Sequence, residues 1–265
     1  MTEVTHTAAE QSVPKKAEGS VDFFASFDFS KLDTSLESML KAGVHFGHLK
    51  SRRHPKMDEY IYTTRKNINI VDLQKTVEKL ETAGKFLAAI AKSGKPIMFV
   101  GMKKQTHDTV KSLALRVGQF YVIDRWLGGT LTNFSCIRGR ARFLRDAEDK
   151  LAQGEFKKYT KFEQAKKGEE MARLEKKVGG IKLMEELPGA IVIADTKEAG
   201  LVLSEARKMN VPVVGIVDTN TDPSNVDYPI PGNDDALSSL RLLLGYLGKS
   251  VIAGKEAQKD TKESE

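Results

Sequence analysis

Residues Ala190–Val217 read AIVIADTKEAGLVLSEARKMNVPVVGIV, and this stretch decides the fold. It begins with the apolar run AIVIA at Ala190–Ala194 and ends with VPVVGIV at Val211–Val217. Both runs have the length and the β-branched composition of buried strands, and the segment between them, over about residues 197–209, has helical character. A strand, a helix and a second strand in this order predict a parallel pair of strands joined by a crossover helix.

The same alternation of strand and helix continues toward both ends of the chain. Asp72 is a suitable N-cap for a helix that runs to about Ser93, and Gly94 is a suitable stop. The run PIMFV at Pro96–Val100 then predicts a buried strand, followed by a helix over about residues 104–117. We therefore predict an α/β fold with a parallel sheet and helices on both faces. Further strand-like runs are Asn67–Val71 and Phe120–Ile123, and a last apolar helix follows Asn233.

Residues 135–180 interrupt this alternation, because they contain almost no β-rich run. Two apolar seams at nearly heptad spacing, separated by a break at Gly154, predict two charged helices that form a hairpin with coiled-coil character. So narrow a seam does not cover a broad sheet face, and we expect the hairpin to project. The seams consist of Ile137, Ala141, Leu144 and Leu151, interrupted at Glu148, and of Met171, Leu174 and Val178.

The domain organisation follows from these patterns. Residues 36–134 and 181–248 are expected to form the α/β domain, with residues 135–180 as the inserted hairpin. Residues 1–35 and 249–265 are polar and charged, and we expect a mostly disordered N-terminal extension and a disordered C-terminal tail. A phenylalanine cluster in the extension could dock on the body or on a neighbour; it contains Phe23, Phe24, Phe27 and Phe29.

Composition indicates an ordinary globular protein, with 40% hydrophobic and 29% charged residues among 265. The single cysteine, Cys136, excludes an intrachain disulfide and fits a reducing compartment. No apolar run reaches the roughly 18–20 residues of a membrane helix, and the N-terminus lacks the apolar stretch of a secretory signal. We therefore expect a cytoplasmic protein without a membrane partner.

Positive charge is concentrated in one part of the chain. Residues 48–180 contain 29 lysines and arginines against 15 aspartates and glutamates, an excess of +14, whereas the whole chain is only +6. Residues 186–248 are acidic, with a net charge of −5. Such a division favours a polyanionic partner for the basic part.

Two basic stretches have further features that suit nucleic-acid binding. Arg138, Arg142 and Arg145 are spaced to share one helix face, and arginine binds phosphate through paired hydrogen bonds. Basic side chains near Tyr60 and Tyr62 lie beside aromatic rings that can stack on exposed bases. The alternative for the helix is a solvated charged face. The predicted RNA-binding residues are Lys50, Arg52, Arg53, Lys56, Arg65, Lys66, Lys103, Lys104, Arg125, Arg138, Arg142, Arg145, Lys157, Lys158 and Lys161.

Catalytic signals are incomplete. Asp195 and Asp218 each follow a predicted core strand, where open parallel sheets bind ligands. The turn-forming residues after Asp218 favour a structural role instead. In Ser93–Pro96, proline replaces the Ser or Thr that a phosphate-binding loop needs. We predict that the chain is not an enzyme, and the alternative is a phosphate-handling enzyme that uses Asp195 and Asp218.

A metal site is not predicted either. His45, His48 and His54 are close in sequence, but Cys136 lies far from them, so the usual set of zinc ligands is incomplete. Histidines among basic residues more often make polar surface or phosphate contacts. The sequence therefore predicts no metal, no cofactor and no small-molecule substrate.

Several motifs occur in order along residues 36–248, and RWLGGTLTNF at Arg125–Phe134 and IPGNDDA at Ile230–Ala236 are the most specific. In this order they resemble the bacterial family of small ribosomal subunit protein two. Arg53 and His54 depart from the family, which usually has Trp and Asn there, as does Ala199, where an acidic residue is common. The other matching segments are Leu36–Gly47 (LESMLKAGVHFG), His54–Met57 (HPKM), Gly179–Ile181 (GGI), Pro188–Pro212 and Val217–Pro223 (VDTNTDP).

The resemblance implies a flavodoxin-like α/β domain with a protruding helical hairpin, and a structural role in the small ribosomal subunit. It implies binding to small-subunit ribosomal RNA in support of translation. It also implies ribosomal proteins as partners, including protein one, which family members help to recruit, with proteins three, five and eight nearby. The remaining alternative is a protein-only scaffold that uses the hairpin as a coiled-coil partner.

Overall fold

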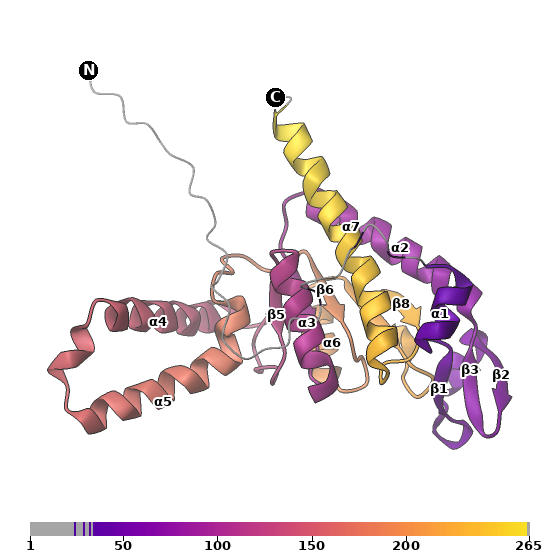
Figure 1. The fold of residues 1–265 in the computed structure, drawn as a ribbon, viewed down its shortest axis with the longest axis horizontal. Coiled ribbons are helices and arrows are strands. Elements are labelled where there is room, and N and C mark those ends of the chain that lie inside the picture. Colours follow the sequence, from indigo (N-terminus) through magenta and orange to yellow (C-terminus); the bar gives the residue numbers. More distant parts are fainter. Residues whose placement is uncertain (1–23, 25–28, 30–31, 33, 264–265) are drawn as a thin grey trace.

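A five-stranded parallel sheet forms the centre of the molecule (Figure 1). The computed structural model describes residues 24, 29, 32 and 34–263. All neighbouring strands in this sheet are parallel, which confirms the predicted α/β fold class. From one edge to the other, the strands are β5 (Phe120–Val122), β4 (Ile97–Val100), β6 (Ala190–Ile193), β7 (Val213–Val217) and β8 (Tyr228–Pro231).

Helices cover both faces of this sheet. Successive strand residues point to opposite faces, so Phe99 and Val192 pack on one side while Met98 and Ile193 pack on the other. The first side is covered by α2 (Leu73–Lys92), α3 (Lys104–Arg116) and α7 (Leu237–Glu263), with α1 (Leu36–Ala42) against α2 and α7. The second side is covered by α6 (Gly200–Lys208), by the segment that contains Trp126 and by the base of the hairpin.

The boundaries of α2 follow the local signals. The Asp72 side chain accepts a hydrogen bond from the backbone N–H of Gln74 at 3.0 Å, and Gly94 has a φ of +77° just after the last turn. Both features match the predicted N-cap and stop. The helix therefore begins and ends where its sequence indicates.

A second, three-stranded antiparallel sheet lies beside α1 (Figure 1), and we call it the small sheet. The predicted strand at Asn67–Val71 forms, as β3 (Ile68–Val71), but it lies in this sheet between β1 (Phe46–Leu49) and β2 (Ile61–Arg65). Lys66 and Asn67 both have positive φ and make the two-residue turn from β2 to β3. Apolar character alone does not distinguish this strand from those of the parallel sheet.

The hairpin projects from the β5 edge of the parallel sheet, which confirms the predicted insertion (Figure 1). It consists of α4 (Phe134–Ala152), the short turn η4 (Glu155–Lys158) and α5 (Lys161–Val178). Its base is part of the core, since Ile137, Leu144 and Val178 are buried against the second face of the sheet. The predicted seam position Leu151 is wrong: its side chain is 53% exposed, because the buried stripe of α4 ends at Ala147.

The C-terminal segment differs from the prediction. Residues 249–263 continue α7 and are not a disordered tail. The continuation packs on α2: Val251 is buried, and a Cβ at Gly254 would lie 2.3 Å from the backbone oxygen of Ala88. Lys255 Nζ also donates to the carbonyls of Val117 and Gly118 at 2.8 Å. No helix in the described part of the chain is long and apolar enough to cross a membrane.

The predicted N-terminal extension lies largely outside the described residues. Phe24 and Phe29 are described, and Phe24 is buried in the core with Phe29 packed beside it. These two members of the phenylalanine cluster therefore dock on the body of the protein.

Substitution at the base of the hairpin should destabilise the whole domain, whereas substitution near its tip should not. Leu144→Ala removes a buried side chain from the core, and we expect the free energy of unfolding to fall by about 2–4 kcal/mol. Phe162→Ala is the matched control, because the Phe162 side chain is 78% exposed, and we expect a change within about 0.5 kcal/mol. Urea unfolding measures the free energy of unfolding of both variants. An equally small loss in Leu144→Ala and Phe162→Ala would show that the base of the hairpin is not part of the core.

Candidate nucleic-acid interface

Three arginines line one flank of α4, next to its buried stripe. Arg142 is exposed and Arg145 is half-buried, and neither forms an ion pair with any described residue. Arg138 donates from Nη1 to the backbone oxygen of Glu185 at 3.1 Å, which leaves its other guanidinium N–H groups available. The structure therefore brings the three predicted arginines together with their charge largely uncompensated.

The tip of the hairpin combines lysines with aromatic rings. Lys158 and Lys161 are exposed, while nothing is described for the side chain of Lys157. Lys167 lies over the rings of Tyr159 and Phe156, with its Nζ 3.2 Å and 5.3 Å from the two ring centroids. Sequence reasoning missed these aromatic contacts, because they join the turn at residues 156–159 to Lys167, which lies well inside α5.

A second group of basic side chains lies on the small sheet. Lys50 and Arg52 are in η2 (Lys50–Arg52), and Arg65 and Lys66 are at the turn between β2 and β3; all four are exposed. The backbone N–H of Lys50 donates to the carbonyl of Asn67 at 2.8 Å and holds η2 beside this turn. These four residues, with Tyr62 at 76% exposure on β2, form what we call the small-sheet surface.

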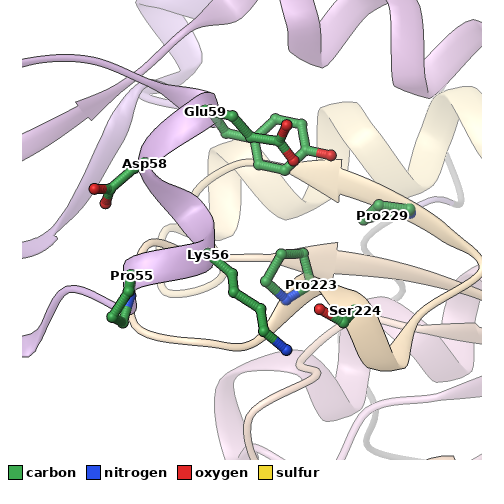
Figure 2. Close-up of a pocket in the computed structure, with 8 residues that line it drawn as sticks. Pro55, Lys56, Asp58, Glu59, Pro223, Ser224 and Pro229 are labelled. Carbon is green, nitrogen blue, oxygen red and sulfur yellow. The ribbon is translucent and has the colours of Figure 1, made fainter.

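Arg53 and Lys56 are paired within the protein instead. Arg53 forms an ion pair with Asp58, and Lys56 Nζ lies 3.0 Å from Asp222 Oδ2. The Ser224 backbone N–H and Lys56 lower the pKa of Asp222 to about 2. In Figure 2 the Lys56 side chain extends toward Pro223 and Ser224, so it joins η3 (Pro55–Tyr60) to η6 (Pro223–Asn225) across a surface hollow.

Among the remaining predicted residues, Lys104 and Arg125 are exposed, but Lys103 is not available for RNA. Its Nζ lies 3.0 Å from Asp234 Oδ1, 3.1 Å from Asp235 Oδ1 and 3.6 Å from Asp195 Oδ1. These carboxylates raise the pKa of Lys103 above its ordinary value, although burial opposes this. The ammonium is thus neutralised internally, and we withdraw Lys103 as an RNA contact.

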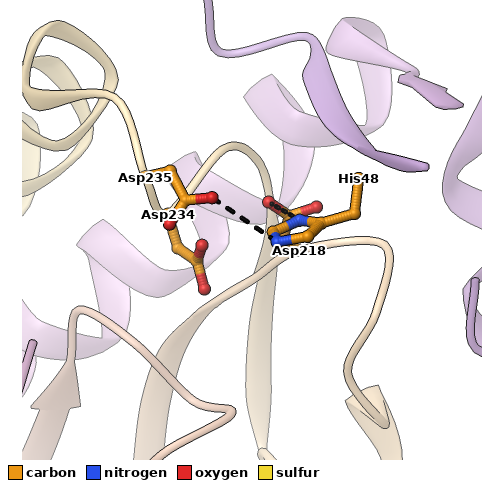
Figure 3. A group of neighbouring side chains, drawn as sticks. All are labelled: His48, Asp218, Asp234 and Asp235. Carbon is orange, nitrogen blue, oxygen red and sulfur yellow. Dashed lines mark ion pairs between the residues drawn. The ribbon is translucent and has the colours of Figure 1, made fainter. Parts of the chain in front are cut away.

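The acidic residues form a cluster at the carboxyl ends of β6, β7 and β8. Asp195 and Asp218 come together there with Asp234 and Asp235, which sequence reasoning did not single out. His48 joins them from β1, with Nδ1 3.0 Å from Asp218 Oδ2 and Nε2 3.4 Å from Asp235 Oδ2 (Figure 3). Burial and the neighbouring Asp218 raise the pKa of Asp234 to about 7.

The other two histidines do not enter this cluster. His54 caps η3, where its Nδ1 accepts a hydrogen bond from the backbone N–H of Lys56 at 3.3 Å. The His45 ring lies tilted against the Phe46 ring, with 4.0 Å between the centroids, and burial lowers the pKa of His45. The three histidines are close in sequence, but they do not form a common site in the structure.

A buried glutamate holds the loop that leads into the hairpin. Glu205 Oε1 accepts from the Trp126 indole N–H at 3.1 Å and from the Gly129 N–H at 2.8 Å. Its Oε2 accepts from the backbone N–H groups of Leu131 at 3.0 Å and Thr132 at 3.2 Å. Burial opposes ionisation, but these donors favour the carboxylate and keep the pKa of Glu205 below its usual value.

The two exposed basic groups lie far apart on the molecule. Figure 1 shows the hairpin at one end of the longest axis and the small sheet at the other, with the parallel sheet between them. One phosphate group cannot contact both. The arrangement suits a long or folded polyanion that meets the protein at two places.

The chain is similar to known proteins over most of its length. The model of the family described as Ribosomal protein S2 matches residues 39–254, a range that contains both basic groups and the hairpin. The small ribosomal subunit protein uS2 of Roseiflexus sp. (strain RS-1) is 48% identical over 221 residues. That match covers 83% of this chain and 84% of the relative.

Glu205→Gln should destabilise the fold at neutral pH. The amide would place N–H donors against backbone N–H groups, and we expect a loss of about 1–3 kcal/mol in the free energy of unfolding. The pKa of Glu205 is lower in the folded chain than its ordinary 4.5, so the stabilisation is present above that pH and is lost as the pH falls through the folded value. The difference from wild type should therefore shrink below about pH 4.5.

Urea unfolding at a series of pH values measures this effect. Glu169→Gln, at an exposed position on α5, is the control and should match wild type throughout. A Glu205→Gln variant as stable as the control at pH 7 would contradict the role of the carboxylate.

Proposed function

The chain belongs to the ribosomal protein S2 family, and we propose that it binds small-subunit ribosomal RNA through the hairpin and the small-sheet surface. As a member of this family it is a structural component of the small ribosomal subunit, where it supports translation, and it is not an enzyme. Its partners are ribosomal RNA and neighbouring ribosomal proteins. The proposal concerns which residues make the contacts.

The observation that carries the proposal is the uncompensated charge of Arg142 and Arg145 on a projecting helix. A guanidinium without an internal carboxylate can bind a phosphate with two parallel hydrogen bonds. Since the base of the hairpin is packed into the core, the arginines are presented on a fixed support and not on a loose loop. Fixed donors lose less conformational entropy when they bind.

The hairpin tip and the small-sheet surface add a different kind of contact. At the tip the Tyr159 ring lies against Lys167, and on the small-sheet surface Tyr62 of β2 is exposed. Aromatic rings can stack on unpaired bases, whereas lysines contact phosphates without regard to sequence. We assign Lys158 and Lys161 to the first surface and Lys50, Arg52, Arg65 and Lys66 to the second. Lys104 and Arg125 are exposed but belong to neither surface.

Loss of the α4 arginines should weaken RNA binding more than loss of equal charge elsewhere. Arg138→Ala, Arg142→Ala and Arg145→Ala together should lower affinity for small-subunit ribosomal RNA at least tenfold. The slope of log affinity against log salt should fall by about 2–3, because each phosphate that the protein no longer neutralises lowers it by about 0.7–0.9. Filter binding over a salt series measures both quantities.

The matched control is Lys166→Ala, Arg173→Ala and Lys176→Ala, which removes the same charge from exposed positions on α5. We expect this control to keep most of the affinity. Equal losses in both triple variants would show that overall charge, and not the α4 face, determines binding.

We also propose that ribosomal protein one is among the protein partners. The family resemblance suggests it, and α1 with the adjoining β1 exposes apolar side chains that a protein partner could cover: Leu40 at 50%, Phe46 at 50% and Leu49 at 48%. Exposed apolar side chains at neighbouring positions are typical of protein interfaces.

Leu40→Glu should separate this contact from RNA binding. Small subunits that contain the variant should retain less protein one after sedimentation, because a charge would replace an apolar contact. RNA affinity of the free protein should stay at the wild-type level. Full retention of protein one on variant subunits would contradict a contact at α1.

A further inference from the structure

A side of α4 that carries none of the three assigned arginines exposes an aromatic ring. Phe143 is 55% exposed on this projecting helix (Figure 1), although its ring has no polar atom to hydrogen-bond with water. Residues three, four and seven positions apart share one side of a helix. On this basis we define the Phe143 face by Cys136, Gly139, Arg140, Phe143, Asp146, Ala147 and Lys150.

The glycine of this face is not required by any contact in the described part of the chain. Gly139 lies inside α4, where glycine is less favourable than alanine. A Cβ built on Gly139 would meet no atom within 4 Å, whereas one on Gly254 would clash with α2. The φ angle of Gly139 is not positive either. The space beside this residue is therefore open to another molecule.

Gly139 also leaves the Phe143 ring uncovered. Side chains on a helix lean toward its N-terminus, over the residues three and four positions before them. For Phe143 these residues are Arg140 and Gly139. A long side chain at position 139 would pack on the ring, as apolar side chains four residues apart do. Glycine instead keeps a flat apolar surface accessible, with empty space next to it.

Positive side chains lie on both sides of the ring along the helix. Arg140 and Lys150 are exposed, and neither forms an ion pair with any described residue. They are about 15 Å apart along the helix axis, with Phe143 between them. Asp146 is the one acidic residue of the Phe143 face, so the face is positive as a whole. A flat ring between two unpaired cations is complementary to a partner that is both flat and anionic.

We propose that Phe143 is a stacking platform for an unpaired nucleotide of RNA. The base lies on the ring, over the space beside Gly139, and the flanking phosphates meet Arg140 and Lys150. Exposed bases stack on aromatic side chains, whereas paired bases are enclosed in their own helix. The inference rests on the proposed RNA binding of the hairpin. It adds the kind of RNA that this part of the hairpin contacts, a single-stranded loop or bulge.

The rival is a protein partner that covers the Phe143 ring. The centre of a protein interface is poor in charged residues, but Phe143 has Arg140 three positions before it and Asp146 three positions after it. Leu151 is the other large apolar side chain that α4 exposes, at 53%. It lies about 12 Å further along the helix, so the two side chains do not form one apolar patch. The charges therefore favour RNA.

Phe143→Leu separates the aromatic ring from its apolar character. Leucine is apolar and suits a helix, but it has no flat aromatic face. We expect the full-length variant to bind small-subunit ribosomal RNA about tenfold more weakly in filter binding, within the range of one lost stacking contact. Phe143→Tyr keeps the ring and should bind as wild type does. Leu151→Ala, the control for an exposed apolar side chain, should also bind as wild type does.

The salt dependence distinguishes the platform from the arginine contacts. Stacking releases no counterions, so Phe143→Leu should keep the wild-type slope of log affinity against log salt, whereas loss of the α4 arginines should lower it. The platform and the arginine contacts can therefore fail independently. On a fully paired RNA duplex, Phe143→Leu and wild type should bind equally. An equal loss on duplex and on ribosomal RNA would overturn the preference for unpaired bases.

Gly139→Leu should move stability and RNA affinity in opposite directions. The melting temperature should rise by about 2 °C, because leucine has a higher helix propensity than glycine. RNA affinity should fall about as far as in Phe143→Leu, because the new side chain covers the ring. Gly139→Ala is the matched control: it should show a similar rise in melting temperature and keep the affinity, since its Cβ meets no atom. Wild-type RNA affinity in Phe143→Leu or in Gly139→Leu would overturn the platform and favour the protein partner.

Discussion

The Glu205 carboxylate, buried on α6, fixes the point at which the hairpin leaves the parallel sheet. Its two oxygens accept hydrogen bonds from Trp126 and from backbone N–H groups between Gly129 and Thr132. These charge-assisted bonds favour one conformation of the loop. The returning end is fixed by space: a Cβ at Gly180 would lie 2.1 Å from the Tyr121 carbonyl oxygen. With both ends held, α4 and α5 project in a defined direction and carry their charges away from the sheet.

The basic residues fall into two groups, those that pair with a carboxylate within the protein and those that do not. Lys103, Lys56 and Lys182 each reach a carboxylate and hold two segments together; Lys182 lies 3.0 Å from Glu148 at the base of the hairpin. Side chains on the hairpin flank and at the β2–β3 turn have no such partner among the described residues. Those that remain uncompensated are the ones that we propose for phosphate contact, and they are fewer than the +14 excess alone suggests.

Local sequence patterns were sufficient to predict the elements whose formation depends on nearby residues. Apolar runs identified β4, β6 and β7, Asp72 and Gly94 marked the ends of α2, and the loss of β-rich runs marked the hairpin. Pairings between distant segments were not accessible: Lys103 meets Asp234 across 131 residues, and nothing near either one indicates it. The same reason applies to Glu205, which lies in an ordinary helical sequence, and to α7, whose last turns are held by packing on α2.

The two proposed RNA contacts lie at opposite ends of the molecule (Figure 1). The most direct measurement is photo-crosslinking from small subunits assembled with a photoreactive side chain at position 142 on α4 or at position 65 on β2. We expect crosslinks to small-subunit ribosomal RNA from both positions, at nucleotide segments that do not overlap. Crosslinks to protein alone from both positions, or to one shared RNA segment, would contradict it.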